Sequence, residues 1–171
     1  MRRPFTHAAA LILVSGLVGD SGFAAQQNRY QRPTSITATI TGSPKLRDGT
    51  FAGKGTSGIC GEIPKMSSMT GEDTFVIEFS DGPQSPGSVY NVSFGSNQLV
   101  RGATSASKFR LNVSVVTADG GKPPVYALDS QTPKPGESGT VTLSQKGQAT
   151  TLSLTGMNDM KERITLLITC G

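Results

Sequence analysis

Tryptophan is absent from this sequence, and the one histidine is His7, near the N-terminus. Ser-His-Asp and Cys-His catalytic systems depend on an imidazole, as do zinc and copper sites with histidine ligands. Because His7 lies in a segment that we expect to be removed, the mature chain should contain no imidazole. The sequence therefore predicts a protein that is not an enzyme and carries no cofactor. The lack of tryptophan also argues against a sugar site built on stacked aromatic rings.

No apolar run is long enough to cross a membrane as a helix. The longest one, residues 8–18, follows a pair of arginines and precedes the small residues Gly22 and Ala24. A basic start, a short apolar stretch and small residues before the cleavage point are typical of a secretory signal. We therefore expect residues 1–24 to be a removable signal peptide. The mature protein is predicted to be secreted, to the periplasm or the cell surface, without a transmembrane segment.

Charged residues are few and scattered, with 16 basic and 12 acidic side chains and a net charge of +4. The sequence has no run of lysine and arginine and no basic stretch interleaved with aromatic residues. Nucleic-acid binding needs a concentrated basic surface, so we predict no nucleic-acid partner. Mild basicity instead suits a protein that faces an anionic envelope and contacts another envelope or extracellular protein.

Cysteine is scarce as well, since the chain has only Cys60 and Cys170. An even number of cysteines in an exported protein predicts a disulfide. The bridge would close a loop of about 110 residues, which is worth roughly 4–5 kcal/mol in the chain-entropy model. A redox or metal role for this pair has little support, because there is no C-x-x-C motif and no nearby histidine.

The mature chain is long enough for one domain with a full hydrophobic core. Residues 25–34 are polar and contain Pro33, so we expect a flexible N-terminal segment and a single domain spanning 35–171. Within that domain, apolar and polar residues alternate in short segments, most clearly at 36–40, 74–80 and 109–115. This period of two predicts β-strands, and no window shows the apolar spacing of a helix.

The last third of the chain has the clearest pattern. Segments 140–144 and 150–155 flank a turn at 145–148, which predicts a hairpin with Gly147 at a position of positive φ. In the final segment, Cys170 is in phase with three large aliphatic residues and should point into the core. Short alternating strands separated by turns predict an all-β fold, an antiparallel β-sandwich, with a small open β-barrel as the alternative.

Two matches to functional motifs lack their usual structural context. The G-x-G-x-x-G match at residues 53–58 is followed by Cys60 and Pro64, whereas a dinucleotide site needs a helix there to hold the pyrophosphate. Ser105 and Lys108 have the S-x-x-K spacing of serine acyl-enzymes, but the companion motifs of those enzymes are missing. Neither match predicts a catalytic site.

Acidic residues come close together at Glu72-Asp73 and at Glu78 and Asp81. Paired carboxylates serve glycosidases, and denser arrays of oxygen ligands bind calcium. Because aromatic platforms and further ligands are lacking, we expect these side chains to make a strand and its turn soluble.

Methionine forms two M-x-x-M pairs, Met66 with Met69 and Met157 with Met160. These pairs lie in the segments after Cys60 and before the strand that ends at Cys170. If the disulfide brings those strands together, the four thioethers would form a soft site suited to Cu(I) or Ag(I). Methionine also fills irregular gaps at the ends of cores or makes an adaptable patch for a partner, and the sequence leaves these alternatives open.

A family resemblance is carried by three features: Ser57-Gly58-Ile59-Cys60, the hairpin at 139–156, and the last strand at 164–170, which ends in Thr-Cys. Together they make the chain similar to small actinobacterial surface lipoprotein antigens of the LpqH type. The resemblance implies a non-catalytic β-sandwich exposed at the cell envelope, with an early cysteine paired to the terminal Thr-Cys. The lipid-attachment cysteine of that family is missing here, so the resemblance does not extend to a membrane anchor.

The main hypothesis is therefore an exported, non-catalytic binding or structural β-domain of the cell envelope or extracellular space. The alternative is a periplasmic Cu(I)- or Ag(I)-binding protein that uses the four methionines. A third hypothesis is an inhibitor or subunit that docks on a larger secreted protein.

Overall fold

A computed structural model describes residues 30–44, 48–64, 72–80, 85–117 and 122–171, apart from the side chains of residues 56 and 57. These residues form ten strands and no helix, so none of them belongs to a helix able to span a membrane. The strands are β1 (Gln31–Thr41), β2 (Gly49–Ile63), β3 (Thr74–Ser80), β4 (Val89–Ser96), β5 (Ser105–Ala106), β6 (Arg110–Val115), β7 (Val125–Asp129), β8 (Ser138–Lys146), β9 (Ala149–Met157) and β10 (Arg163–Cys170).

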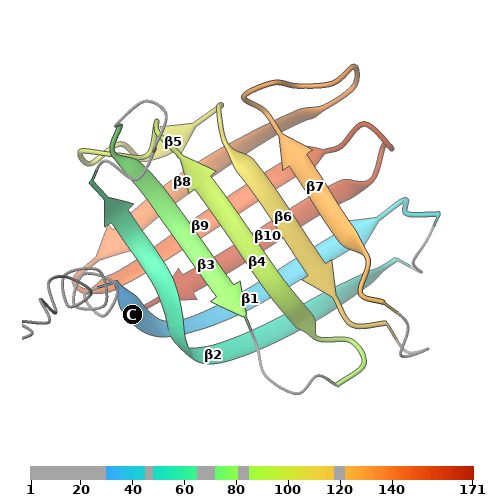
Figure 1. Ribbon diagram of the computed structural model, residues 1–171, viewed down its shortest axis with the longest axis horizontal. Helices are drawn as coiled ribbons and strands as arrows, with labels where there is room; N and C mark the ends of the chain where they lie inside the picture. The colour runs from blue at the N-terminus through green and yellow to red at the C-terminus, as the bar shows by residue number, and fades with distance from the viewer. Residues whose placement is uncertain (1–29, 45–47, 65–71, 81–84, 118–121) are drawn as a thin grey trace, which may run out of the picture.

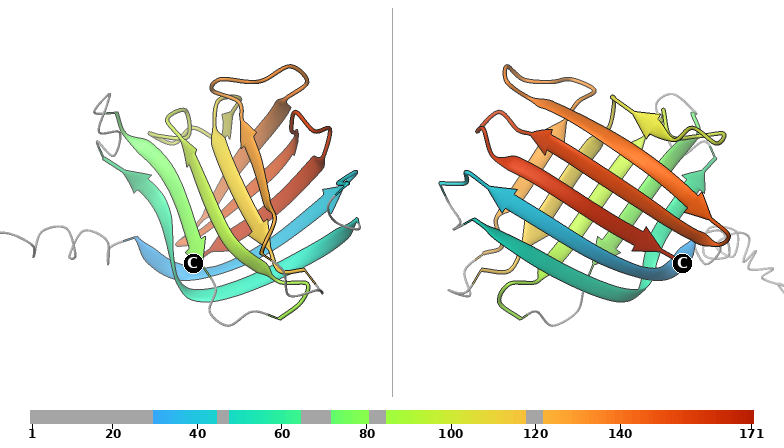
Figure 2. Two further views of the ribbon diagram at one scale, coloured as in Figure 1. Left: turned by 45° about the vertical axis from the view of Figure 1, so that its right-hand side comes forward. Right: turned by 180° about the vertical axis from the view of Figure 1, so that it is seen from behind.

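All ten strands belong to one antiparallel sheet in the order β5-β8-β9-β10-β1-β2-β3-β4-β6-β7. The sheet curls into a half-barrel, so that β8, β9, β10 and β1 lie across the core from β3, β4, β6 and β7 (Figures 1 and 2). The predicted all-β antiparallel fold is confirmed. The two halves face each other as in a sandwich, but β1 and β2 join them into one sheet, as in an open barrel.

Side chains fill the inside of this curl. Because successive strand residues point to opposite faces, the apolar member of each alternating pair turns inward. The largest buried side chains include five aromatic residues that come mainly from one half of the sheet, namely Phe75, Phe79, Phe94, Phe109 and Tyr126. The rings of Phe94 and Phe109 stack with centroids 5.9 Å apart. Large apolar side chains of the described strands therefore fill the inside of the curl as a hydrophobic core.

The glycine-rich segment at residues 53–58, which matches G-x-G-x-x-G, lies within strand β2. Its glycines make room for large neighbours: a Cβ atom on Gly53 would lie 3.0 Å from the ring of Phe79, and one on Gly55 would lie 2.9 Å from it. A Cβ atom on Gly58 would overlap the hydroxyl of Thr34. The G-x-G-x-x-G match thus serves the close packing of a bent strand.

The disulfide predicted from the sequence is present between Cys60 and Cys170, which lie 6.4 Å apart at their Cα atoms. Strand β1 runs between the two bridged strands, and strands with one neighbour between them are about 9.6 Å apart in a flat sheet. The strands β2 and β10 therefore converge at the start of β1, and the bridge holds the sheet in its curl. Both cysteines are buried, and for Cys170 this confirms the prediction from the phase of the last strand.

Strand β1 begins at Gln31, four residues before the predicted start of the domain. Residues 31–34, which were expected to be flexible, pair with β2, with a register shift between Arg32 and Thr34. That shift accommodates Pro33, which has no backbone N–H to donate to a ladder. Residues 25–29 and the predicted signal peptide lie outside the described part of the chain. The predicted β8–β9 hairpin is confirmed, with Gly147 at φ 62°.

The free edge strand β7 is tied back to the other half of the sheet by polar contacts. The Ser43 hydroxyl donates to Oε1 of the buried Glu162 over 2.7 Å and lies 3.5 Å from the Tyr126 hydroxyl on β7. The Asn158 side-chain amide donates to the other oxygen of Glu162 over 2.7 Å. Beyond them, Lys134 and Asp159 form an ion pair of 2.7 Å. These contacts connect β7 and the loop after it to the β9–β10 turn.

Candidate functional site

A groove of about 410 Å³ lies on the outer face of β3, β4 and β6. Its size falls within the roughly 300–1,000 Å³ of small-molecule sites, and polar groups converge on an apolar strip within it, which makes it the best candidate for a binding site. The lining residues are Glu72, Thr74, Val76, Glu78, Ser93, Phe94, Gly95, Asn97, Arg110, Asn112 and Gln131.

Strand register explains why these side chains meet. On β3, Phe75, Ile77 and Phe79 point into the core, so Thr74, Val76 and Glu78 point outward. Glu78 pairs with Ser93 on β4, and Ser93 pairs with Asn112 on β6. The next outward row contains Val76, Gly95 and Arg110.

Small residues in the middle strand hollow the groove. Ser93 and Gly95 on β4 stand between longer side chains on β3 and β6, and a Cβ atom on Gly95 would meet only Thr74 Cγ2, at 3.9 Å. Beside Gly95, Val76 is only 4% exposed although it points to the outer face. The groove thus has an apolar floor within a polar rim.

Glu78 lies at one side of this hollow and is half-buried. The Ser93 hydroxyl donates to its Oε1 over 2.8 Å, and no described residue bonds to its other oxygen or forms an ion pair with it. Burial raises the pKa of Glu78, and the hydrogen bond from Ser93 offsets part of that effect. A carboxyl group with a raised pKa in a groove is a marker of functional sites.

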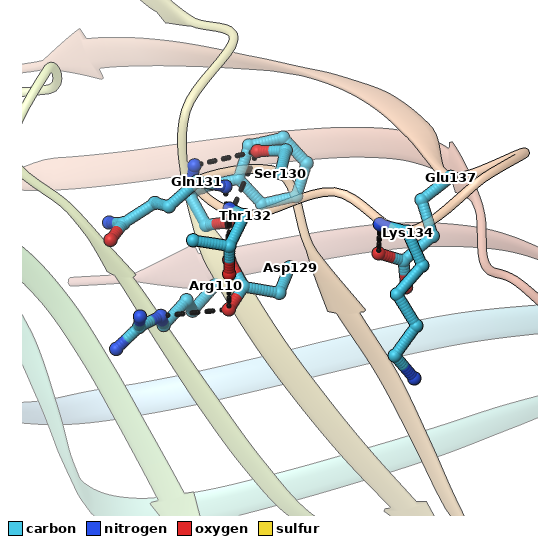
Figure 3. Close-up of polar contacts among 8 residues, drawn as sticks. Arg110, Asp129, Ser130, Gln131, Thr132, Lys134 and Glu137 are labelled. Atoms are coloured by element: carbon cyan, nitrogen blue, oxygen red, sulfur yellow. Dashed lines mark hydrogen bonds and ion pairs between the residues drawn. The ribbon is translucent and has the colours of Figure 1, made fainter.

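The opposite rim is held rigidly by Asp129 at the end of β7 (Figure 3). Its Oδ2 accepts hydrogen bonds from Arg110 Nε and Thr132 Oγ1, both at 3.0 Å, and its Oδ1 accepts the backbone N–H groups of Gln131 and Thr132. Burial alone would raise the pKa of Asp129, but these hydrogen bonds and the Arg110 charge lower it. The positive charge of Arg110 is therefore matched by Asp129.

At the far end, the Asn97 amide donates to Glu72 Oε2 over 2.9 Å. This hydrogen bond holds the Glu72 side chain next to the start of β3. The sequence predicted that Glu72 and Glu78 would be solubilising residues, and it did not predict the groove. The sequence alternation predicts which residues of these three strands point outward. It does not predict the register that aligns Glu78, Ser93 and Asn112.

The predicted methionine site is only partly described. Met157 is half-buried at the end of β9, and Met160 is 51% exposed in the turn that follows. Met66 and Met69 lie outside the described residues. Met157 pairs with Arg163, and Arg163 pairs with Thr41 at the end of β1, whereas the described end of β2, at Ile63, lies beyond the start of β1. The register therefore gives no support to a meeting of the two methionine pairs.

Within the described ranges, no group of three histidine, cysteine, aspartate or glutamate side chains is arranged to hold a metal ion. Of the two motif matches, Ser105 lies on the short edge strand β5, and Lys108 is exposed between β5 and β6. Comparison of the chain with family models, curated proteins and solved structures finds no match.

Proposed function

We propose that this protein is an exported, non-catalytic binding domain of the cell envelope or extracellular space, and that it binds a small ligand in the groove over β3, β4 and β6. The observation that carries the proposal is the groove itself, where polar groups from three strands surround a hollow with an apolar floor. The inward side chains of the described strands form a buried core, and the proposal therefore places the ligand on the outer face.

The disulfide supports the exported location, since such bonds persist in oxidising compartments. The bridge and the packed core also make the sheet a rigid platform, and rigid strands hold binding groups more precisely than loops do. No observation favours the alternative Cu(I) or Ag(I) site, which stays a prediction.

The test is an NMR screen of the full mature chain against a mixed panel of cationic, anionic and neutral small molecules. We expect backbone amide shifts to cluster at β3, β4 and β6 for at least one class of molecule. The variant Gly95→Val should fold normally, because its added methyl groups enter the open groove, and should lose those shifts. Shifts that survive in Gly95→Val, or that cluster on β9 and β10, would contradict the proposal.

A further inference from the structure

The charge of the groove is opposite in sign to that of the whole chain. Glu72 and Glu78 are the acidic residues, and Arg110 is the cation, among the described residues that line the groove; Arg110 pairs with Asp129 beside it. The full sequence, by contrast, has a net charge of +4. A local negative field on a mildly basic protein attracts positively charged groups to this surface.

Neither Glu72 nor Glu78 forms an ion pair with a described residue, and Glu78 is the half-buried one of the two, whereas Glu72 is exposed. Arg110 is joined to Asp129 at 3.0 Å, and Glu72 accepts a hydrogen bond from Asn97. Glu78 accepts one hydrogen bond, from Ser93, at one oxygen only. A partly desolvated carboxylate is more stable when a donor, above all a charged one, occupies its free oxygen.

Asn112 provides a second hydrogen-bond acceptor, across from Glu78 in the cross-strand row Glu78, Ser93 and Asn112. Asn112 lies two strands away, about 10 Å at the Cα atoms, and the small Ser93 lies between them. A planar guanidinium or an ammonium group above Ser93 would donate one hydrogen bond to Glu78 Oε2 and another to the side-chain Oδ1 of Asn112. The apolar floor at Val76 and Gly95 would contact the methylene groups next to that cation.

Resting on the proposed function, we propose that the groove binds an organic cation, an ammonium or guanidinium group on an aliphatic chain, with Glu78 as its counter-charge. Glu78 forms the charged hydrogen bond, Asn112 accepts a second one, and the strip at Val76 and Gly95 packs on the chain. A free amine and an arginine or lysine side chain of a partner share this chemistry.

The experiment is an NMR titration of the full mature chain with two probes of nearly equal shape. Nα-acetyl-arginine amide carries the guanidinium, and Nα-acetyl-citrulline amide replaces it by a neutral urea. We expect saturable shifts at the amides of Val76, Glu78, Ser93 and Asn112 with the arginine probe and no saturable shifts with the citrulline probe. A tripeptide with a central arginine and the free amine agmatine distinguish the two sources, because the true source should bind more tightly.

The matched variants are Glu78→Gln and Glu137→Gln. Both remove one carboxylate, but Glu137 lies in the loop between β7 and β8 and does not line the groove. Glu78→Gln keeps an oxygen for Ser93, so the sheet should fold unchanged, and the affinity for the arginine probe should fall about tenfold or more. The Glu137→Gln variant should bind like wild type.

Equal binding of the two probes, or an unchanged affinity in Glu78→Gln, would overturn the inference. If only neutral or anionic molecules from the panel shift the groove amides, the inference fails while the proposed function stands. If no molecule of any class shifts them up to roughly 20 mM, where even a very weak site would respond, both fail.

Discussion

The disulfide between Cys60 and Cys170 should supply much of the stability of this fold. It closes a loop across 110 positions of sequence. In the chain-entropy model, restricting the unfolded chain over that length is worth about 4.8 kcal/mol at 25 °C. Domains of this size have total stabilities of about 5–15 kcal/mol, so losing the bridge should remove between about a third and nearly all of the stability.

The assay is urea unfolding of three forms: oxidised wild type, reduced wild type and the double variant Cys60→Ala/Cys170→Ala. Reduced wild type keeps both sulfur atoms in the core, so its difference from the oxidised form isolates the cross-link. We expect that difference to be about 3–5 kcal/mol. The m-value should rise on reduction, because the unfolded chain without the bridge exposes more surface.

The double variant separates packing from cross-linking. Both cysteines are buried, so replacing them by alanine should cost a further 1–2 kcal/mol or so relative to the reduced protein. A loss below about 1 kcal/mol on reduction would refute the reasoning that the bridge stabilises the fold by restricting the unfolded chain.

Three further predictions concern single residues. Gly156→Ala should destabilise the protein by about 2–3 kcal/mol in urea unfolding, because its Cβ atom would overlap Leu128, whereas Gly95→Ala should be nearly neutral; equal effects would contradict this. Asp129→Asn should cost no more than about 1 kcal/mol at neutral pH. The pKa of Asp129 is lowered by folding, so this contribution is lost as the pH falls, and thermal melts of the two proteins should converge in acid. Folding raises the pKa of Glu78, so wild-type stability should fall as the pH rises from the ordinary carboxyl pKa through the raised value. Over that pH range the Tm of Glu78→Gln should fall less than the Tm of wild type as the pH rises, and an equal fall would contradict the assignment.

The last of these predictions implies a conflict between stability and binding at one residue. A half-buried carboxylate without a cation disfavours the folded state above its pKa. The other charged residues lining the groove, Glu72 and Arg110, do not relieve it, since Glu72 is negative and Arg110 is joined to Asp129. Binding groups that reduce stability are common at functional sites.

Much of the fold was predictable because its signals are local. Alternation within 74–80 and 109–115 predicted β3 and β6, and the glycine at 147 predicted the β8–β9 turn. Two cysteines in a chain that we expected to be exported predicted the bridge. The glycine-rich part of β2 was not predicted to be a strand, because glycines remove the alternating side chains that mark one. The reason for these glycines, the space needed by Phe79, lies in another strand.

The groove was not predictable, because it depends on register between strands. Glu78, Ser93 and Asn112 are 15 and 19 residues apart in sequence, and only the β3–β4 and β4–β6 ladders align them. Sequence alternation placed Glu78 and Asn112 on outward faces but did not indicate that they face one hollow. Register follows from the packing of the whole sheet, which no single segment specifies.

The Glu78 carboxylate is proposed to bind the positive group of an organic cation in the groove. A pH titration of the Glu78 carboxyl group tests this most directly. The Glu78 carboxyl carbon can be followed by NMR as the pH changes, with and without saturating Nα-acetyl-arginine amide. The account predicts a raised pKa in the free protein and a clear fall when the probe is bound, because the cation stabilises the charged carboxylate. An ordinary pKa in the free protein, or one that the probe leaves unchanged, would contradict it.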